Sequence, residues 1–416
     1  MSLIVQKYGG TSVGSIEKIR NVAKRVIAMK EKGHDMVVVL SAMAGETDKL
    51  IRLAQEMTES PNPRELDVLI STGEQVSVAL FCMAVQSLGS KATSLLGHQV
   101  RIVTDDAYGR ARISEIDTRR IMGEIRNDKI VAVAGFQGLD EKGNITTLGR
   151  GGSDTTAVAV AAALKAQVCE IFTDVEGVFT TDPNICPKAR KMKKISYEEM
   201  LEMASLGAKV LEIRSVEFAK KFKVPVHVRS TFTDKEGTMV VQEDKSMEKI
   251  LVSGVTYNKN EARITITKVP DRPGIASKIF TPISEAGVIV DMIIQNTSAE
   301  GLTDLTFTVP KLDFNKTLAI VKKVAKEIKA ERVMGDENIA KVSIIGLGMR
   351  NHSGVATTMF TALAKEGINI MMIATSEIKI SCVIDEKYTE LAVRTLHSVF
   401  HLDEEPITKE SSKTKV

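Results

Sequence analysis

Two glycine-rich segments carry residue types suited to binding phosphate and carboxylate groups. The first, KYGGTS from Lys7, follows an apolar run that predicts a strand. Its adjacent glycines allow backbone amides to approach phosphate oxygens, and Lys7 at the strand end can reach a phosphoryl group in transfer. This is not a Walker A loop, because GxxxxGK(S/T) occurs nowhere in the chain. On its own, a Gly-Gly pair after a strand is equally well explained as a turn.

The second glycine segment, LGRGGSDTTA from Leu148, combines a cation with a carboxylate. Arg150 has the planar guanidinium that binds carboxylates through two hydrogen bonds. Ser153 and Asp154 open a predicted helix, where Asp154 could serve only as a cap. Paired with Lys7, the same carboxylate could instead hold the lysine where charge develops during transfer.

Two further segments offer acidic side chains. In FTDVEGVFTTDP from Phe172, Asp174 follows a buried strand and Asp182 precedes a proline. Such a pair could bind Mg²⁺ or nucleotide hydroxyls, or could be ordinary turn aspartates. In STGEQVS, Glu74 lies near the start of a predicted helix, where it could cap the helix or bind a substrate ammonium.

The elements that must position these side chains alternate along the chain up to residue 230. Three apolar runs are typical of strands buried on both faces of a parallel sheet, and they begin at Met36, Ile130 and Val168. Helical patterns cover residues 15–32, 66–88 and 155–164. The alternation predicts an α/β fold in which helices sandwich a mostly parallel sheet. Ligands of such sheets bind at the carboxyl ends of the strands, where the glycine segments fall.

Beyond a charged and polar stretch over residues 231–249, the sequence repeats at an offset of 80 residues. The segment from Val269, VPDRPGIASKIFTPISEAGVIVDMII, matches the segment from Met349, MRNHSGVATTMFTALAKEGINIMMI. Six residues recur at that offset: Gly274, Ala276, Phe280, Thr281, Gly287 and Met292. Each copy predicts a strand, a glycine turn, a helix and a second strand, and a turn at a helix N-terminus can bind a carboxylate. The pair predicts either two amino-acid sensors or two modules that only mediate dimerisation.

Composition argues against several other classes of protein. The net charge of +3 and the aromatic content of 4% provide no footprint for nucleic acid. No long run of uncharged apolar residues predicts a membrane span, and the first residues lack the pattern of a signal peptide. The four cysteines include no CxxC pair, so we expect reduced thiols in a cytoplasmic protein.

Taken together, the motifs resemble those of the aspartate kinases in the amino-acid kinase superfamily. In chain order they are KYGGTS, SAMAGETD, STGE, GRGGSDTTA, TDVEGVFTTDP and SLGAKVL. The tandem repeat resembles a pair of ACT domains, which have an α+β ferredoxin-like fold. The resemblance covers nearly the whole chain, and GRGGSDTTA is its most specific element. It implies a catalytic domain over 1–230, a linker over 231–249, ACT repeats over 250–335 and 336–405, and a disordered tail over 406–416.

The resemblance implies that the γ-phosphoryl group of ATP passes to the β-carboxylate of L-aspartate, giving ADP and 4-phospho-L-aspartate. This reaction is the first step of the branch toward lysine, threonine and methionine. Mg²⁺ would enter with ATP rather than bind a dedicated set of side chains. The nucleophile is a carboxylate already ionised at neutral pH, so no general base is needed, and none of the six histidines lies in a motif. Positioning and charge neutralisation should therefore dominate catalysis.

Site residues are implied position by position. Lys7 would contact the transferring phosphoryl group, and Asp154 would orient Lys7. The other nucleotide contacts would come from Tyr8, Gly9, Gly10, Ser12, Ser41, Thr173, Asp174, Phe179, Asp182 and Lys209. Glu74 would bind the α-amino group of aspartate and Arg150 its α-carboxylate. The substrate site would be completed by Thr47, Gly151, Gly152 and Ser153.

The resemblance also implies amino-acid effectors, lysine and/or threonine, at an interface between ACT repeats of two chains, and hence a homo-oligomer. Candidate contacts in the first repeat are Asp271, Gly274, Ala276, Asp291 and Gln295. In the second repeat they are Asn369, Ile370, Ser376 and Glu377. Asp291 and Glu377 could pair with an effector ammonium or be ordinary polar residues. Met247 could start a shorter subunit by internal initiation, which would give an α2β2 assembly.

Two alternative functions stay open at this point. Another kinase of the same superfamily could act on glutamate, N-acetylglutamate or UMP. UMP would require a base pocket, and an N-acetylated substrate has no ammonium for Glu74. The second alternative is a non-catalytic amino-acid sensor, which need not retain all five of Lys7, Arg150, Asp154, Asp174 and Asp182.

Overall fold

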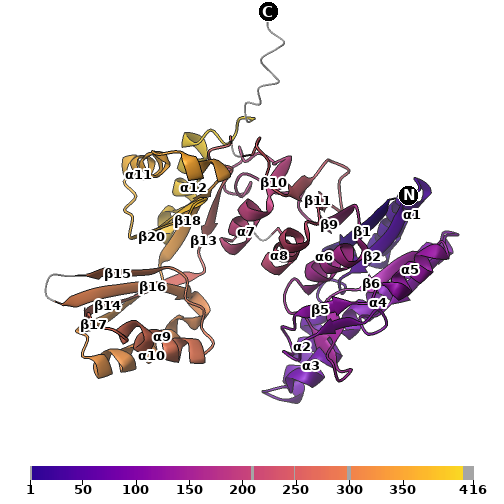
Figure 1. The fold of residues 1–416 in the computed structure, drawn as a ribbon, viewed down its shortest axis with the longest axis horizontal. Coiled ribbons are helices and arrows are strands. Elements are labelled where there is room, and N and C mark those ends of the chain that lie inside the picture. The colour runs from indigo at the N-terminus through magenta and orange to yellow at the C-terminus, as the bar shows by residue number, and fades with distance from the viewer. Residues whose placement is uncertain (1, 208–209, 248, 298–300, 406–416) are drawn as a thin grey trace, which may run out of the picture. The chain divides into compact units, whose positions relative to one another are not determined.

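The computed structural model describes residues 2–207, 210–247, 249–297 and 301–405. The chain forms two compact units, each with its own sheets and hydrophobic core. The N-terminal unit comprises residues 1–179, 191–205 and 209–247, and the C-terminal unit comprises 180–190, 206–208 and 248–416. The N-terminal unit runs from indigo to magenta in Figure 1, and the C-terminal unit is mostly orange and yellow.

The N-terminal unit is built on an eight-stranded sheet in the order β10-β12-β11-β9-β1-β2-β6-β3. Every neighbouring pair is parallel except β11 and β12. The strands are β1 (Leu3–Tyr8), β2 (Asp35–Leu40), β3 (Ala92–Leu95), β6 (Ile130–Ala134), β9 (Val168–Thr173), β10 (Lys194–Ser196), β11 (Val226–Ser230) and β12 (Thr238–Val241). The central strands β1, β2 and β6 are buried on both faces, which explains their continuous apolar runs.

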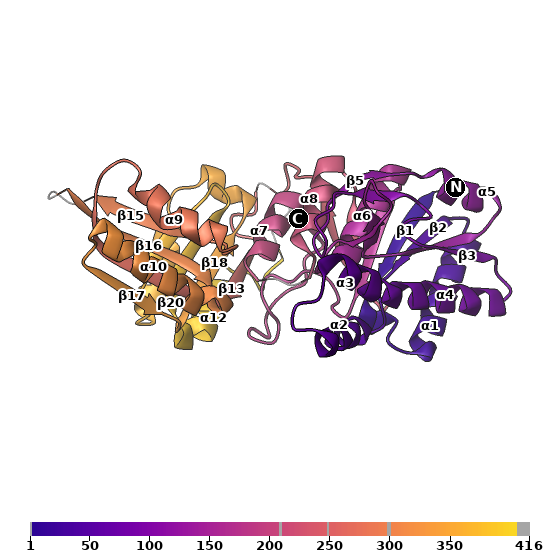
Figure 2. The same cartoon turned by 90° about the horizontal axis from the view of Figure 1, so that it is seen from below.

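Helices cover both faces of this sheet. The helices of this unit are α1 (Ile16–Glu31), α2 (Glu46–Met57), α3 (Pro63–Ile70), α4 (Thr72–Ser87), α5 (Arg119–Arg126), α6 (Gly152–Leu164), α7 (Tyr197–Ser205) and α8 (Ile213–Phe222). Helices α1 and α4 lie side by side on one face (Figure 2), and α6 packs on β1 and β9 from the other. Ser15 caps α1 by accepting a hydrogen bond from the amide of Lys18.

The stretch over residues 66–88 is helical as predicted, but it is divided at Ser71 into α3 and α4. The hydroxyls of Ser71 and Thr72 donate to the carbonyls of Val68 and Leu69, and such local bonds compete with regular helix geometry. By length and composition, Pro63–Ser87 is the one stretch among the described residues that could cross a membrane. Its second half contributes Val78, Phe81 and Val85 to the core under the sheet, as expected of a core helix.

A small second sheet of the N-terminal unit, in the order β5-β4-β7-β8, leads into the GRGG segment. Its strands are β4 (Ile102–Thr104), β5 (Ile113–Ile116), β7 (Gln137–Leu139) and β8 (Ile145–Thr147). Strand β8 ends one residue before Leu148, so this sheet delivers the glycine loop to the start of α6.

The C-terminal unit contains two antiparallel modules. The first has the sheet β15-β16-β14-β17, with strands β14 (Glu261–Pro270), β15 (Ile293–Thr297), β16 (Leu302–Pro310) and β17 (Arg332–Asp336). Its helices, α9 (Ile275–Glu285) and α10 (Phe314–Ile328), cover one face of that sheet (Figure 1). The second has the sheet β13-β18-β20-β19, with strands β13 (Gly254–Asn258), β18 (Ile339–Ile345), β19 (Met372–Thr375) and β20 (Lys379–Asp385), and helices α11 (Val355–Lys365) and α12 (Thr389–Val399).

The internal repeat corresponds to equivalent parts of these two modules. Helices α9 and α11 begin directly after Gly274 and Gly354, which have φ angles of +90° and +95°. The recurrence of glycine is explained by this left-handed backbone, which side chains with a Cβ rarely adopt. Strand β13 lies in the range expected for the first repeat, yet it pairs with β18 of the second module. The first module is therefore inserted between two strands of the second.

Candidate active site

Lys7 and Asp154 meet at the carboxyl edge of the main sheet. Lys7 is the penultimate residue of β1, and Asp154 lies in the first turn of α6. The Lys7 Nζ and Asp154 Oδ1 atoms are 2.5 Å apart, and each side chain is only about one-tenth exposed. Because charges interact more strongly away from water, this ion pair fixes the direction of the ammonium. An ammonium has three donors, so Lys7 keeps the capacity to bind a phosphate oxygen as well.

The KYGGTS segment makes a tight turn directly after β1. A Cβ atom on Gly10 would lie 2.8 Å from the carbonyl oxygen of Ala42, so this position requires glycine. Ser12 is buried, and its hydroxyl lies 2.6 Å from that of Thr231. The Tyr8 side chain points to the opposite face from Lys7, where its ring stacks on Phe172 with centroids 4.6 Å apart. Only the backbone of Tyr8 faces the turn, and its carbonyl accepts a hydrogen bond from the amide of Ser41.

Glu74 is a buried carboxylate with spare hydrogen-bonding capacity. It lies in the first turn of α4, is 3% exposed and accepts a hydrogen bond from the amide of Ala42 at 3.0 Å. Among the described residues, its second oxygen, Oε2, has no hydrogen-bond partner. Burial raises the pKa of Glu74 to about 7, against the lowering effect of the Ala42 amide. A cationic ligand would supply the missing partner, and an ammonium has the right charge.

The GRGGSD segment turns sharply into α6. Gly149 and Gly151 have positive φ angles of +78° and +67°, and a Cβ on Gly151 would lie 2.5 Å from the side chain of Glu212. The positive φ angle of Gly151 and its close approach to Glu212 both exclude a residue with a larger side chain at this position. Arg150, between them, is exposed, while Ser153 is buried at the start of the helix. Thr47 is partly buried in the first turn of α2.

The nucleotide residues implied by TDVEGVFTTDP are not gathered in one unit. Thr173 and Asp174 follow β9 in the N-terminal unit, and the Thr173 hydroxyl donates to Asp174 at 3.0 Å. Phe179 belongs to the same unit, whereas Asp182 lies in the segment 180–190, which belongs to the C-terminal unit. Both carboxylate oxygens of Asp182 already accept hydrogen bonds, from the amide of Asn184 and the hydroxyl of Tyr257. Lys209 lies outside the described residues.

Four of the effector residues expected in the first repeat line one cavity of about 350 Å³: Asp271, Gly274, Ala276 and Gln295. The cavity lies where β14 turns into α9, beside β15 and β16. The fifth, Asp291, is not among its lining residues. In the second repeat, Asn369 and Ile370 precede β19. The amide of Ser376 donates a hydrogen bond to the carbonyl of Lys379. The carboxylate of Glu377 lies 3.6 Å from the guanidinium of Arg350.

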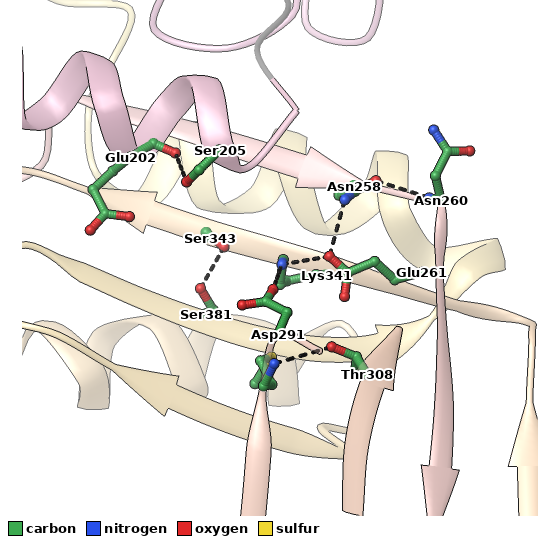
Figure 3. A network of polar contacts seen from close by, with 11 residues as sticks. Glu202, Ser205, Asn258, Asn260, Glu261, Asp291, Thr308, Lys341, Ser343 and Ser381 are labelled. Atoms are coloured by element: carbon green, nitrogen blue, oxygen red, sulfur yellow. Dashed lines mark hydrogen bonds and ion pairs between the residues drawn. The ribbon is translucent and has the colours of Figure 1, made fainter. Parts of the chain in front are cut away.

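Asp291 instead forms an ion pair with Lys341 of the second module (Figure 3). The side chain of Lys341 is 3% exposed and also pairs with Glu261 at 2.6 Å. Asn258 donates a further hydrogen bond to Glu261 at 3.1 Å. Burial lowers the pKa of Lys341, but the Glu261 and Asp291 carboxylates outweigh that effect and raise it. The network joins β13 and β18 of one module to β14 and the segment just before β15 of the other.

Sequence reasoning missed several residues that hold the site. Asp67 and Arg214 bind the backbone around the GRGG segment, Tyr257 binds Asp182, and Thr231 contacts Ser12. None belongs to a recognisable motif, because each acts on a backbone group or on a residue distant in the chain.

The fold and the site define a small-molecule kinase of the α/β type, followed by a pair of regulatory-type modules. The model of the amino acid kinase family matches residues 2–230, and models of ACT domains match residues 263–328 and 342–400. The chain is 58% identical to an aspartokinase of Pseudomonas aeruginosa, over 97% of this chain and 98% of that protein. It is 53% identical to an aspartokinase of Helicobacter pylori, over 97% and 100%. The chain therefore belongs to the aspartate kinases of the amino acid kinase family.

Solved structures agree with this assignment. Aspartokinase III of E. coli in complex with aspartate and ADP is similar at a TM-score of 0.78 and 27% identity, over 95% of this chain and 99% of that one. The same enzyme in complex with lysine and aspartate gives a TM-score of 0.77.

Proposed function

We propose that this site transfers the γ-phosphoryl group of ATP to the β-carboxylate of L-aspartate, and that Lys7 is the central catalytic cation. The supporting observation is the buried ion pair in which Asp154 holds the Lys7 ammonium at 2.5 Å. Negative charge accumulates when a carboxylate approaches a triphosphate. A preoriented ammonium stabilises that charge without having to reorganise during the reaction.

Aspartate binding would use the two ends of the substrate's backbone. Glu74 would receive the α-ammonium on its unpartnered oxygen, which would return the carboxyl to its ionised form. Arg150, exposed on the glycine loop, would bind the α-carboxylate. Gly151, Gly152, Ser153 and Thr47 would complete the substrate site. The β-carboxylate of aspartate is already ionised at neutral pH and can attack without losing a proton, so a general base is not required.

The nucleotide would lie over the carboxyl ends of β1 and β9. Its phosphates would meet the amides of Gly9, Gly10 and Ser12, the backbone of Tyr8, and Ser41; Lys209 would approach them as well. The rest of the nucleotide would be bound by Thr173, Asp174, Phe179 and Asp182. In the part of the chain that the structure describes, no three His, Cys, Asp or Glu side chains gather as metal ligands. We propose that Mg²⁺ enters on the phosphates of ATP, where it would neutralise charge.

Regulation would follow from the paired ACT modules, with lysine and/or threonine as effectors. The aspartokinase III structure with lysine is a relative in which that amino acid is bound. The cavity lined by Asp271, Gly274, Ala276 and Gln295 is the candidate site in the first module. An effector inhibits only if it binds the inactive state more tightly than the active one. Homo-oligomers would form through these modules, and the enzyme would work in the cytoplasm at the head of the lysine and threonine branch.

We propose in addition that internal initiation at Met247 gives a shorter subunit. Such a subunit would lack Ile185, which belongs to the hydrophobic core of the second module. It would therefore expose apolar surface unless a partner covered it. A native complex that gives a single band on a denaturing gel would contradict the α2β2 assembly.

The test is to trap the acyl phosphate as a hydroxamate with ATP and Mg²⁺. We expect product with aspartate and little with glutamate, and inhibition when lysine, threonine or both are added. Folded protein that binds ATP but forms no hydroxamate with any carboxylate would point to a UMP-type kinase. Folded protein that does not bind ATP would point to a sensor without activity.

A further inference from the structure

The GRGG loop is held against a second segment of the N-terminal unit by direct backbone contacts. The amide of Ala111 donates to the carbonyl of Thr147 at 2.9 Å. A Cβ atom on Gly149 would lie 2.8 Å from the carbonyl oxygen of Gly109. Residues 109–111 and 147–149 therefore run so close together that a small shift of one would be transmitted to the other.

A buried carboxylate binds the amide side of this pair of segments. Asp67, in α3, is 1% exposed. Its Oδ2 atom accepts hydrogen bonds from the amides of Gly109 at 2.9 Å and Thr147 at 2.7 Å, and its Oδ1 atom accepts one from the Thr147 hydroxyl at 2.7 Å. Burial raises the pKa of Asp67, although these donors act in the opposite direction. A carboxylate suits this position despite its desolvation, because its two oxygens accept hydrogen bonds from three donors.

A guanidinium binds the carbonyl side of the same segments. Arg214 lies in the first turn of α8, and its Nη1 atom donates to the carbonyl of Leu148 at 2.5 Å. Its Nη2 atom donates to the carbonyl of Ala111 at 2.6 Å. The planar fork of arginine presents one nitrogen to each carbonyl, a fixed geometry that the ammonium of lysine does not reproduce. Asp67 and Arg214 thus clamp one pair of backbone segments from two different helices.

The clamp ends where the proposed substrate residues begin. Leu148, bound by Arg214, is two residues before Arg150 and six before Asp154. The nucleotide turn at Gly9 and Gly10 follows a different strand, and none of the hydrogen bonds of Asp67 or Arg214 goes to it. A change in the clamp should therefore displace the aspartate end of the site before the ATP end.

We propose that Asp67 and Arg214 are positioning residues that set the aspartate-binding loop, so that losing either weakens binding of aspartate selectively. The inference rests on the proposed role of Arg150 as the aspartate carboxylate ligand. It assigns Asp67 and Arg214 no contact with substrate, only control of the backbone that carries the contact.

The experiment measures KM for aspartate and KM for ATP in R214M, R214K and D67N with the hydroxamate assay, together with melting temperatures. Loss of hydrogen bonds to a charged group predicts that R214M raises KM for aspartate at least about tenfold. KM for ATP should stay within about twofold. R214K should lie between wild type and R214M, because lysine keeps the positive charge but lacks the planar pair of donors that faces the two carbonyls. D67N should show the same selectivity, since an amide offers one acceptor oxygen instead of two.

The matched control is R20M, which removes an exposed arginine from α1 of the same unit and should leave both KM values unchanged. Equal rises in both KM values would overturn the proposal. It would also be overturned if folded R214K or D67N had a lowered melting temperature but an unchanged KM for aspartate. If R214M does not fold, R214K and D67N decide the question. Wild-type protein that fails to phosphorylate aspartate would refute the proposed function instead, and that result is separate from any comparison among variants.

Discussion

The hydroxyl of Tyr257, on β13, donates a hydrogen bond to the carboxylate of Asp182 at 2.9 Å. Asp182 belongs to the segment 180–190, whose neighbours on both sides along the chain are in the N-terminal unit. The same segment receives a hydrogen bond from Arg394 of α12 to the Ile185 carbonyl, and Thr180 lies 2.9 Å from the ring of His397. A stretch that begins inside the TDVEGVFTTDP motif is thus folded into the C-terminal unit.

Tyr257→Phe is expected to weaken ATP binding more than aspartate binding. Removing the hydroxyl leaves one oxygen of Asp182 without its donor, which should destabilise the C-terminal unit by about 1–2 kcal/mol. The loosened segment adjoins Phe179, so KM for ATP should rise several-fold while KM for aspartate stays nearly constant. A double-mutant cycle with Asp182→Asn isolates the pair. If the effects of the two substitutions are additive, the interaction free energy between Tyr257 and Asp182 is zero and the hydrogen bond contributes nothing measurable.

Lys7→Ala is expected to reduce turnover to a small residual rate while leaving the fold intact. Loss of a preoriented charge at the transferring group costs about 10²–10³ in kcat. Asp154→Ala should have a similar effect, because the ammonium of Lys7 would lose the partner that directs it. Hydroxamate formation and melting temperature measure the two quantities separately. An unchanged kcat in either variant would remove that residue from the catalytic role.

The glycine segments, the mostly parallel sheet and the tandem modules could be predicted because each leaves a local pattern. Continuous apolar runs indicate buried strands, and positive φ angles restrict Gly274 and Gly354 to glycine. The position of α6 beside β1 follows from strand–helix alternation, and it is what brings Asp154 to Lys7. Such features depend on residues that are close in sequence or repeat with a fixed period.

Other features could not be predicted, since they depend on pairings that have no local signature. Strand β13 pairs with β18 more than 80 residues later, and nothing in its five residues distinguishes that partner from β14. Arg214 binds carbonyl groups, which every residue has, so its partners cannot be inferred from residue types. The sequence left open whether Asp291 binds an effector ammonium or is an ordinary polar residue, and it could not show that the lysine that pairs with Asp291 lies 50 residues away.

Glu74→Gln is expected to weaken aspartate binding and to remove its pH dependence. With a pKa of about 7, Glu74 is partly protonated in the free enzyme at neutral pH, and a protonated carboxyl cannot pair with an ammonium. KM for aspartate in the wild type should therefore rise as pH falls below about 7. In the variant, KM should be at least about tenfold higher and flat from pH 6 to 9. KM for ATP, measured alongside, should change little; equal effects on both would place Glu74 outside the substrate site.

The same substitution should stabilise the ligand-free protein at alkaline pH. The folded-state pKa of Glu74 is raised from 4.5 to about 7, so the folded protein holds the proton more tightly than the unfolded chain. The contribution of Glu74 to the free energy of unfolding is complete below about pH 4.5 and is lost as the pH rises through 7. The contribution lost is on the order of 3 kcal/mol. Urea unfolding at pH 8 should therefore show Glu74→Gln to be more stable than wild type, and a less stable variant would contradict the desolvation of Glu74.

Lys341→Met is expected to destabilise the C-terminal unit more than Asp291→Asn does. Lys341 is buried and compensates Glu261, which is itself only 7% exposed, whereas the Asp291 side chain is 54% exposed. Leaving a buried carboxylate without its partner costs about 3–5 kcal/mol, but a half-exposed one can be rehydrated. The double variant Lys341→Met/Glu261→Gln removes both buried charges and should recover part of the loss.

The pH dependence of that loss separates an ion pair from simple packing. The pKa of Lys341 is raised above its ordinary value, so its contribution is complete below about pH 10.4 and is lost only as pH rises through the folded-state value. The difference between wild type and Lys341→Met should thus be constant from pH 6 to 9 and shrink at strongly alkaline pH. Urea unfolding of the full chain, followed by probes in the C-terminal unit, measures it. A difference that is unaffected by alkaline pH and by the Glu261→Gln background would assign Lys341 to packing through its aliphatic stem rather than to charge.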